Sequence, residues 1–347
     1  MTTVLVTGVG GGGNGEQLVK ALRLAATPYR IVGTDLTMEA AQQSEADVCR
    51  ALPRASDPGY IDALLETCAR ERVDVLLPGS EPELRLIAQH ATRIRQHVAL
   101  LAVNDQTLIE ICSDKFKTVE FLATHGFVSP QSWLVSATEE LESIEHFPLI
   151  VKPTVGGGSQ NVYLIQGRDE LHMICGFLLG YYNSVLVQEY VGRVDQEFTV
   201  GVLFDGSGQL INSIALNRFI MTSLSNRIRV PNRTDRADLG AVLGISSGVS
   251  QGRVDDFPEV RAYCEQVGIA LGAKYAINVQ CRLVDGQPMI FEINPRFSGT
   301  SSIRAMLGFN EPDLLIRKHV LEETLPDRPA YHHGTVLRGL KEILVAN

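Results

Sequence analysis

The sequence contains little of what marks secreted, membrane-spanning or nucleic-acid-binding proteins. Its six cysteines form no Cys-x-x-Cys pair, which argues against a zinc site or a disulfide framework and favours reduced thiols in a cytosol. No apolar run approaches membrane-spanning length, and the N-terminus enters the apolar residues 4–6 without a basic segment, so we identify no signal peptide. We therefore expect a cytoplasmic protein with no membrane partner.

Positive charge is also scarce. The chain carries 31 Lys and Arg against 40 Asp and Glu, a formal net charge of -9, and it has no Lys- or Arg-rich run. Nucleic-acid-binding domains need a basic surface, so nucleic acid is not an expected partner. What is present is an ordinary globular composition, 45% hydrophobic and 20% charged over 347 residues, which is long enough for two or three domains.

The first 112 residues alternate between apolar strand patterns and helical patterns. Strands are expected at 3–7, 29–35, 73–78 and 98–103, with helical periodicity between them. Such alternation predicts an α/β unit built on a doubly wound parallel sheet.

The loop after the first expected strand carries Gly8-x-Gly10-x-x-Gly13, with Asp35 further on, and this is the dinucleotide-binding fingerprint. It favours either an NAD-dependent dehydrogenase or a Rossmann-like front domain that binds no dinucleotide. We prefer the front domain, because nothing downstream resembles a hydride-transfer site. Glu81 follows the strand expected at 73–78, at the carboxyl edge where such sheets bind ligands, and is a candidate substrate contact.

Residues 278–296 are the most informative stretch, because an Asp-Gly pair joins two alternating apolar runs and predicts a β-hairpin. Side chains alternate along a strand, so Glu292 and Asn294 share a face, on which Gln280 of the partner strand converges. One carboxylate and two amide carbonyls are hard oxygen ligands, the type that Mg²⁺ takes when it also binds substrate phosphates. Arg296 adds a planar cation to this face.

Upstream, an apolar strand pattern at 148–153 contains Lys152, and a glycine-rich loop follows directly. A lysine in such a run extends to a rim or meets an anion. Glycines permit positive φ and close approach, so their backbone N–H groups can surround phosphate oxygens. The loop lacks the Gly-Lys-Ser/Thr ending of a P-loop. We predict that it covers nucleotide phosphates through Gly156, Gly157, Gly158 and Ser159.

The order of these motifs, with a Glu-Tyr-Val segment at 189–191 between loop and hairpin, resembles the ATP-grasp superfamily. Within it, the chain is similar to the carbamoyl-phosphate synthase large chain and to carboxylate–amine ligases, from Val4 to about Leu325. The resemblance implies a Rossmann-like front domain (1–112) followed by an ATP-grasp fold, with a small lid domain (113–185) and a large nucleotide- and metal-binding domain (186–347).

The resemblance also implies roles for individual residues. Lys115 would reach the ATP phosphates, and Lys152 would contact the α-phosphate and the adenine. Glu197 would bind the ribose hydroxyls, with Asp195 as the alternative. The adenine edge would be held by Glu189, Tyr190 and Val191. The implied cofactors are ATP and Mg²⁺, with Mn²⁺ as an alternative metal.

Some features depart from the family pattern or add to it. Gln280 stands where many members carry an acid, although the carbamoyl-phosphate synthase branch also has glutamine. Residues 217–236 hold five arginines, which suit a solvated surface loop and an anion-binding loop equally well. Arg304, beside a Ser-rich turn that resembles one in the family, is a second candidate substrate contact.

From these features we expect an ATP-dependent ligase that activates a carboxylate as an acyl phosphate, releases ADP and forms a C–N bond with an amine. Arg296, Asn294 and Lys152 are the expected catalytic residues. The alternatives are an ATP-grasp carboxylase or kinase-like enzyme, a non-catalytic nucleotide-binding protein and, least favoured, the dehydrogenase. Both substrates would be small molecules, and a homodimer is left open.

Overall fold

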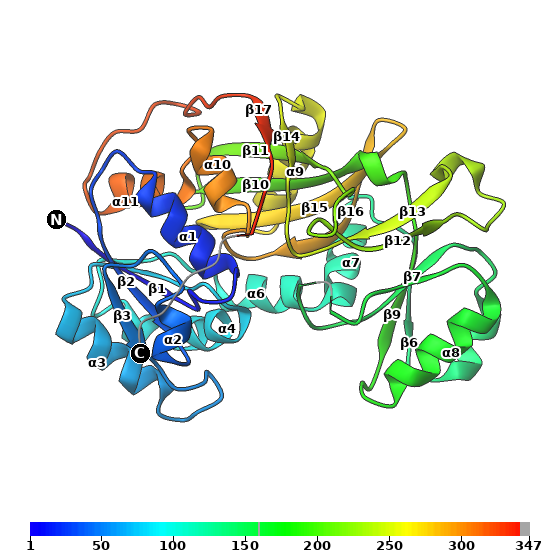
Figure 1. Cartoon of the computed structure of the whole chain (residues 1–347), viewed down its shortest axis with the longest axis horizontal. Helices are drawn as coiled ribbons and strands as arrows, with labels where there is room; N and C mark the ends of the chain where they lie inside the picture. Colours follow the sequence, from blue (N-terminus) through cyan, green and yellow to red (C-terminus); the bar gives the residue numbers. More distant parts are fainter. Residues whose placement is uncertain (159, 341–347) are drawn as a thin grey trace.

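The computed structural model describes residues 1–158 and 160–340 (Figure 1). These residues form a five-stranded parallel sheet, a six-stranded and a four-stranded antiparallel sheet, and a separate two-stranded hairpin. In Figure 1 the parallel sheet lies at the lower left, a six-stranded sheet runs across the top, and a four-stranded sheet lies at the lower right. None of the described helices is long and apolar enough to cross a membrane.

The first sheet has the strand order β3-β2-β1-β4-β5, and all its strands run parallel. The strands are β1 (Thr3–Thr7), β2 (Arg30–Asp35), β3 (Val48–Ala51), β4 (Val75–Leu77) and β5 (Leu100–Leu101). Its helices are α1 (Asn14–Arg23), α2 (Met38–Ala41), α3 (Tyr60–Glu71), α4 (Glu81–Gln89) and α5 (Ala91–Ile94). Helix α1 packs on one face and α3 and α4 pack on the other, so the predicted doubly wound sheet is confirmed.

The four-stranded sheet has the order β6-β9-β7-β8, and its pairs are antiparallel. Its strands are β6 (Ser132–Val135), β7 (Leu149–Pro153), β8 (Tyr163–Ile165) and β9 (Val185–Glu189), with α8 (Arg168–Leu179) packed on one face. β9 continues to Glu189, four residues beyond the boundary predicted at 185/186. The division into three domains stays a prediction.

The six-stranded sheet has the order β16-β15-β10-β11-β14-β17 and is antiparallel throughout. Its strands are β10 (Glu197–Phe204), β11 (Leu210–Arg218), β14 (Gly252–Val254), β15 (Ala276–Val284), β16 (Gln287–Asn294) and β17 (Gly334–Val336). The helices around it are α6 (Gln106–Ser113), α7 (Lys115–Thr124), α9 (Pro258–Ala270), α10 (Ser301–Met306) and α11 (Glu311–His319). The hairpin of β12 (Asn226–Pro231) and β13 (Val242–Ser246) projects from it towards the four-stranded sheet (Figure 1).

The two faces of the six-stranded sheet differ. One is apolar and packs against α9, whereas the other, called here the polar face, carries polar residues on β15 and β16 as well as apolar residues such as Leu203 and Ile214 that join the core shared with the front sheet. Val200 and Val279 belong to the apolar cluster beneath α9. On the polar face, Gln280 pairs in register with Glu292 and with Thr199. The polar face is therefore the one available for binding a charged ligand.

The predicted hairpin is the pair β15–β16. Its turn residues Asp285 and Gly286 both have positive φ, 50° and 79°, as a two-residue type I′ turn requires. The prediction of alternating strands about this turn is confirmed.

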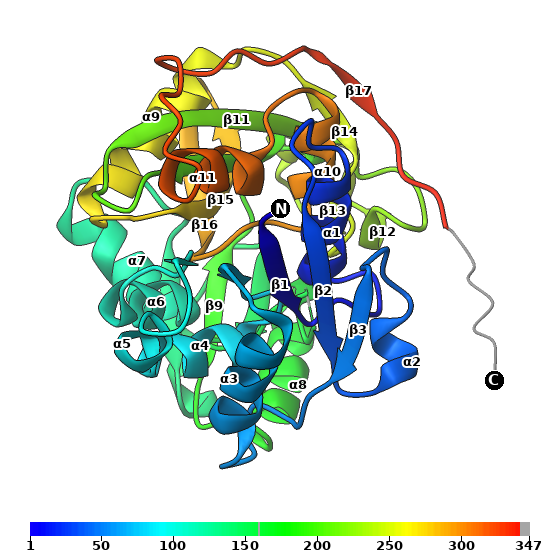
Figure 2. The ribbon, with the colours of Figure 1, turned by 90° about the vertical axis from the view of Figure 1, so that its left-hand side faces the viewer.

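Helix α1 connects the first sheet to the six-stranded sheet. It packs against α10 and α11 as well as against β1, and apolar residues of both sheets join in one buried cluster. Figure 2, which looks at the molecule from the left of Figure 1, shows α1 beside β2 with α10 above it. The front sheet is therefore fixed against the polar face by a shared core.

Candidate active site

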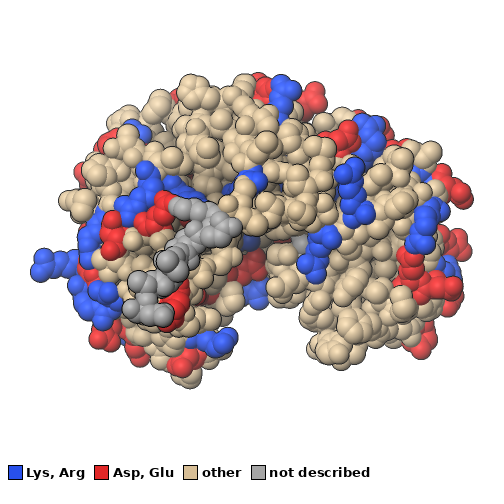
Figure 3. Space-filling model, viewed as in Figure 1, with Lys and Arg blue, Asp and Glu red and all other residues tan. Residues whose placement is uncertain are grey.

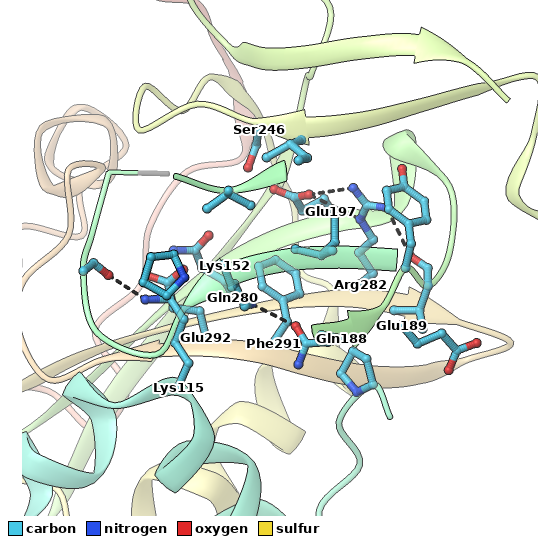
Figure 4. Close-up of a pocket in the computed structure, with 18 of the residues that line it drawn as sticks. Lys115, Lys152, Gln188, Glu189, Glu197, Ser246, Gln280, Arg282, Phe291 and Glu292 are labelled. Carbon is cyan, nitrogen blue, oxygen red and sulfur yellow. Dashed lines mark hydrogen bonds and ion pairs between the residues drawn. The ribbon is translucent and has the colours of Figure 1, made fainter. Parts of the chain in front are cut away.

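One cavity lies between the four-stranded and six-stranded sheets (Figure 4). Its empty volume, which includes the open mouth, is about 790 Å³. Ten of the predicted site residues line it: Lys115, Lys152, Gly156, Gly157, Glu189, Tyr190, Val191, Glu197, Gln280 and Glu292.

Lys152 lies on β7 and is only 5% exposed. Its Nζ donates a 2.9 Å hydrogen bond to Oε1 of Gln188 and lies 5.9 Å from the centre of the Phe291 ring. Burial and the nearby charge of Lys115 lower the pKa of Lys152 to about 7, although Glu292 acts in the opposite direction. A lysine without a close carboxylate in such a cavity is suited to meeting an anionic ligand.

Lys115, the first residue of α7, holds the glycine-rich loop. Its Nζ donates a 2.6 Å hydrogen bond to the carbonyl oxygen of Gly156, and its backbone N–H donates to the carbonyl of Thr154 at 2.8 Å. Gly156 follows an isolated antiparallel bridge between Val155 and Asp114, whereas among the described residues the N–H groups of Gly157 and Gly158 donate to no backbone carbonyl. These amides are therefore available to phosphate oxygens. Gly158 does not line the cavity wall itself, and Ser159 lies outside the described residues.

The segment predicted to hold the adenine follows β9. The N–H of Tyr190 is already used by the carbonyl of Pro148, at 3.1 Å. The Tyr190 ring instead forms cavity wall, with the Arg282 guanidinium 4.4 Å from its centre and its hydroxyl bonded to Gly244. Within the described residues, the N–H of Val191 donates to no backbone carbonyl, so it remains available to a ligand.

Glu197 is 2% exposed and lies between two arginines. Its carboxylate is 3.1 Å from Nη2 of Arg282 (Figure 4). On its other side it is 3.2 Å from Nη1 of Arg218. Burial opposes its ionisation, but these two charges hold the pKa of Glu197 below its ordinary value. One carboxylate is therefore shared by two buried guanidinium groups.

The metal-binding set predicted on the hairpin is brought together. Nδ2 of Asn294 donates to Oε1 of Glu292 at 3.0 Å, and Gln280 lies beside Glu292 in register. Oε1 of Gln280 accepts from Arg218 at 3.3 Å, and Oδ1 of Asn294 accepts from Arg296 at 2.9 Å. Three hard oxygen donors, one of them charged, fit Mg²⁺ when phosphates complete the shell. No group of three or more His, Cys, Asp and Glu with metal-site geometry occurs among the described residues, so a closed all-protein site is not indicated.

Glu81 also reaches this region, from the start of α4. Its Oε1 is 3.0 Å from Nη2 of Arg296, and a Cβ placed on Gly157 would lie 2.9 Å from the same oxygen. Burial alone would raise the pKa of Glu81, but Arg296, with Lys115 behind it, brings that pKa below its ordinary value. A second, smaller cavity joins Glu81 to Asn294, Lys115 and Gly156.

Arg304 does not reach either cavity. It is 1% exposed, its Nη1 donates to Glu311 at 2.8 Å, and its Nη2 donates to Asn278 at 2.6 Å. A Cβ on Gly201 would lie 2.1 Å from this guanidinium, so the group fills the space above β10. The structure places Arg304 in the core, and its predicted role as a substrate contact is corrected.

The arginines at 217–236 do not act as one group. Arg218 is buried beside Glu197, whereas Arg233 pairs with Glu170 of α8 and Arg236 pairs with Asp238 at 2.8 Å. Arg227 and Arg229 are exposed on β12. Figure 3 shows Lys and Arg interspersed with Asp and Glu over the face in view. Neither alternative reading of the segment therefore holds for all five arginines.

The glycine-rich loop after β1 is closed from within the chain. Oδ2 of Asp35 accepts a 2.8 Å hydrogen bond from the N–H of Gly10, and Oε1 of Gln43 accepts from the N–H of Gly11 at 2.9 Å. The acid that would bind a ribose in a dehydrogenase is thus used to hold the loop. This arrangement favours the front-domain interpretation.

Sequence reasoning missed several cavity residues. Arg282 lies on the predicted hairpin, but an arginine in a strand carries no signal that it meets Glu197, 85 positions away. Ser246 and Gly244 come from β13, in a segment that we had not assigned to strands. Phe291 could have been found, because it adjoins Glu292 on the predicted strand.

Two family models match the chain. One described as the PylC-like N-terminal domain matches residues 4–101, and one described as an ATP-grasp domain matches residues 112–300, more than half of the chain. Among curated proteins, the carbamoyl phosphate synthase large chain of Clostridium botulinum is 25% identical over 198 residues, 55% of this chain and 17% of that protein. The arginine-specific large chain of Arabidopsis thaliana is 24% identical over 310 residues, 84% of this chain and 24% of that protein. The chain thus matches less than a quarter of the length of these relatives.

Several solved structures have the same fold as this chain. The L-amino acid ligase of Bacillus licheniformis superposes with a TM-score of 0.64 at 18% identity, covering 92% of this chain and 74% of that one. The N5-carboxyaminoimidazole ribonucleotide synthetase of Thermotoga maritima gives 0.60 at 17% identity, covering 94% and 78%. The glycine-rich loop and the oxygen-rich hairpin lie around one cavity, and the ATP-grasp family model spans both of them at residues 112–300. The chain therefore belongs to the ATP-grasp family.

Proposed function

We propose that the protein is an ATP-dependent carboxylate–amine ligase that activates its carboxylate as an acyl phosphate. The observation that carries this proposal is the meeting of Lys115, Lys152 and the glycine-rich loop with the Glu292 hairpin at one cavity. Family membership supports it, and so do the carbamoyl phosphate synthase relatives. The division into front, lid and large domains at 113 and 186 is part of the same proposal.

In this proposal the adenine lies against Tyr190 and the N–H of Val191, and the phosphates extend towards Lys152 and Lys115. Glu292, Asn294 and Gln280 would hold Mg²⁺, which neutralises phosphate charge when bound. Glu197 lines the cavity, but its two arginines already engage the carboxylate, so ribose binding would use its remaining acceptor capacity.

The chemistry proceeds in two displacements. A carboxylate oxygen attacks the γ-phosphorus, the bond to the β-phosphate oxygen breaks, and ADP leaves. The amine nitrogen then bonds to the acyl carbon, the bond from carbon to the phosphate oxygen breaks, and a proton passes from nitrogen to the departing phosphate. Lys152 and the loop amides would stabilise charge in the first step, while Arg296 would hold the oxyanion.

A kinase would act on a hydroxyl and would need a general base near it. None of the described residues that line the two cavities is His or Asp, and Glu81 is occupied by Arg296. The cavity chemistry therefore supports a carboxylate acceptor over an alcohol.

An ADP-release screen over carboxylate and amine pairs, with MgATP, tests the proposal. Replacing the amine by hydroxylamine should trap the acyl phosphate as a hydroxamate in an amount equal to the ADP formed. Arg296→Ala should lose both products, and exposed Arg229→Ala should lose neither. Accumulation of a phosphorylated alcohol without hydroxamate would show that the enzyme is a kinase.

A further inference from the structure

The β12–β13 hairpin forms part of the cavity wall and reaches across to the four-stranded sheet. Its first strand lies in the stretch where the sequence departs from the family pattern, and the hairpin projects from the six-stranded sheet (Figure 1). Gly244 and Ile245 of β13 line the cavity together with Ile150 and Lys152 of β7. A nucleotide in this cavity would lie between the hairpin and the four-stranded sheet, so its release depends on how firmly these two are held together.

The base of the hairpin, at residues 244–247, is held by buried hydrogen bonds to the six-stranded sheet. Nη2 of Arg282 donates to the carbonyl oxygen of Gly244 at 2.9 Å, and Nη2 of Arg218 donates to the carbonyl oxygen of Ser247 at 2.7 Å. Both arginines are 5% exposed, and they lie on β15 and β11 of this sheet. Because buried charge-assisted hydrogen bonds are strong, we expect the base of the hairpin to stay in place.

The tip of the hairpin, at residues 232–241, meets α8 through exposed charges. Arg233 forms an ion pair with Glu170 of α8, and its backbone N–H donates to Oε1 of Gln166 at 2.7 Å. Glu170 also accepts a 2.7 Å hydrogen bond from the N–H of Gln166, so it joins the tip to the segment before its own helix. The side chain of Arg233 is 64% exposed and that of Glu170 is 34% exposed. An exposed ion pair contributes little to stability and is screened by salt.

Between base and tip, a small apolar cluster joins the hairpin to the four-stranded sheet. Beside it, Nη1 of Arg236 lies 3.4 Å from Oε1 of Glu189 at the end of β9. The cluster has three buried side chains and three partly buried ones packed against them: Tyr190, Leu239 and Leu243, with Ile150, Leu164 and Val230. It is the smallest apolar cluster of the described chain, so it stabilises the contact much less than the sheet cores stabilise their sheets.

We propose that the β12–β13 hairpin is a latch that holds the four-stranded sheet over the cavity and opens at its tip. The difference between the two ends decides which one opens, because the base is held by buried arginines and the tip by an exposed ion pair. When Arg233 and Glu170 separate, β13 and β7 move apart and a nucleotide can pass between them. The inference rests on the proposed function for the identity of the ligand, whereas the latch itself exists in the protein without ligand.

Hydrogen exchange in the nucleotide-free protein tests the latch, and each variant is read on the element that it does not change. Arg233→Glu should speed exchange in residues 163–170, and Glu170→Arg should speed exchange in residues 228–234, each by about two- to five-fold, as expected for an exposed ion pair. The double variant restores an ion pair of reversed polarity and should return both segments towards wild-type exchange. Exposed Arg229→Glu on β12 is the matched control and should leave residues 163–170 unchanged. Circular dichroism of each variant shows that it folds.

Release of MgADP tests whether the latch controls access to the cavity. Surface plasmon resonance on the immobilised protein should give a dissociation rate about two- to five-fold faster in Arg233→Glu and in Glu170→Arg. The double variant and the Arg229→Glu control should release MgADP at nearly the wild-type rate.

The outcomes separate the two proposals. If neither single variant changes exchange across the contact, or if the double variant does not restore it, the hairpin is no latch, whatever the nucleotide result. If exchange responds but MgADP leaves all variants at the same rate, the hairpin does not control release and the inference fails. If the wild-type protein binds no MgADP, the proposed function fails, and hydrogen exchange still decides whether the hairpin is a latch.

Discussion

Lys115 Nζ donates a 2.6 Å hydrogen bond to the carbonyl oxygen of Gly156, so the first residue of α7 tethers the glycine-rich loop. Lys115 lies beside loop amides that are free to bind phosphate. Its Nζ can therefore exchange the Gly156 carbonyl for a phosphate oxygen without moving far. The lysine and the loop are therefore expected to respond together when a nucleotide binds.

Hydrogen exchange measures this response. We expect the amides of Gly156–Gly158 to exchange rapidly without nucleotide and to be protected by a non-hydrolysable ATP analogue with Mg²⁺. Lys115→Met should speed exchange in the nucleotide-free protein and weaken the protection. Lys117→Met, an exposed lysine on the same helix, is the control and should behave as the wild type. Equal exchange with and without the analogue would exclude a phosphate lid.

Replacing Glu292 should remove the only carboxylate of the proposed metal-binding set. Glu292→Gln keeps the shape and the bond from Asn294 but leaves three neutral oxygen donors, so we expect ADP formation to be lost and Mn²⁺ affinity, followed by electron paramagnetic resonance in the presence of ADP, to fall about ten-fold or more. Exposed Glu110→Gln should change neither value. Normal turnover in Glu292→Gln would overturn the metal assignment.

Nucleotide binding should be coupled to proton uptake by Lys152. Its pKa is lowered to about 7, so near pH 8 the amine is mostly neutral, and an arriving phosphate favours the charged form. Affinity for MgATP should be highest below pH 7 and should fall as the pH rises above it. Calorimetry in two buffers of different ionisation enthalpy would count the protons, and Lys152→Met should abolish the uptake.

The lowered pKa of Lys152 also makes the free energy of unfolding depend on pH in a direction that can be predicted. An unfolded lysine titrates near 10.5, so the cost of burying the Lys152 charge is complete below pH 7 and disappears as the pH rises from about 7 to 10.5. The unfolding free energy of the wild type relative to Lys152→Met should therefore increase across this window. A difference that does not change with pH would contradict the buried, shifted lysine.

Replacing Glu197 should lower the free energy of unfolding, apart from any effect on nucleotide binding. Glu197→Ala leaves Arg218 and Arg282 buried without a carboxylate, and breaking a buried pair in this way costs about 3–5 kcal/mol. Asp238→Ala removes a surface partner of Arg236 and should cost no more than about 1 kcal/mol. Urea unfolding monitored by circular dichroism compares the two. Similar midpoints would show that Glu197 is not the buried counter-ion described here.

Local patterns in the sequence were enough to predict the strands and the turn, because side-chain alternation and turn-forming residues determine these elements. The Asp-Gly turn and the two apolar runs predicted β15–β16. The turn alone would place Gln280 opposite Phe291, and an irregularity between Gln280 and Cys281 shifts the register so that Gln280 lies opposite Glu292. The strand–helix alternation predicted the parallel front sheet. Lys152 and the loop after it could be placed at one end of a strand because a charge in an apolar run has few other places to lie.

The tertiary structure alone decided which distant groups meet. Glu81 and Arg296 are 215 positions apart, and no local period relates them. Arg304 follows a Ser-rich turn that suggested a substrate contact, yet Glu311 holds it in a buried ion pair. The reason is physical: neighbours along a strand are set by backbone geometry over a few residues, whereas partners across the molecule depend on the order β16-β15-β10-β11-β14-β17 and on how α1 docks the front sheet against it.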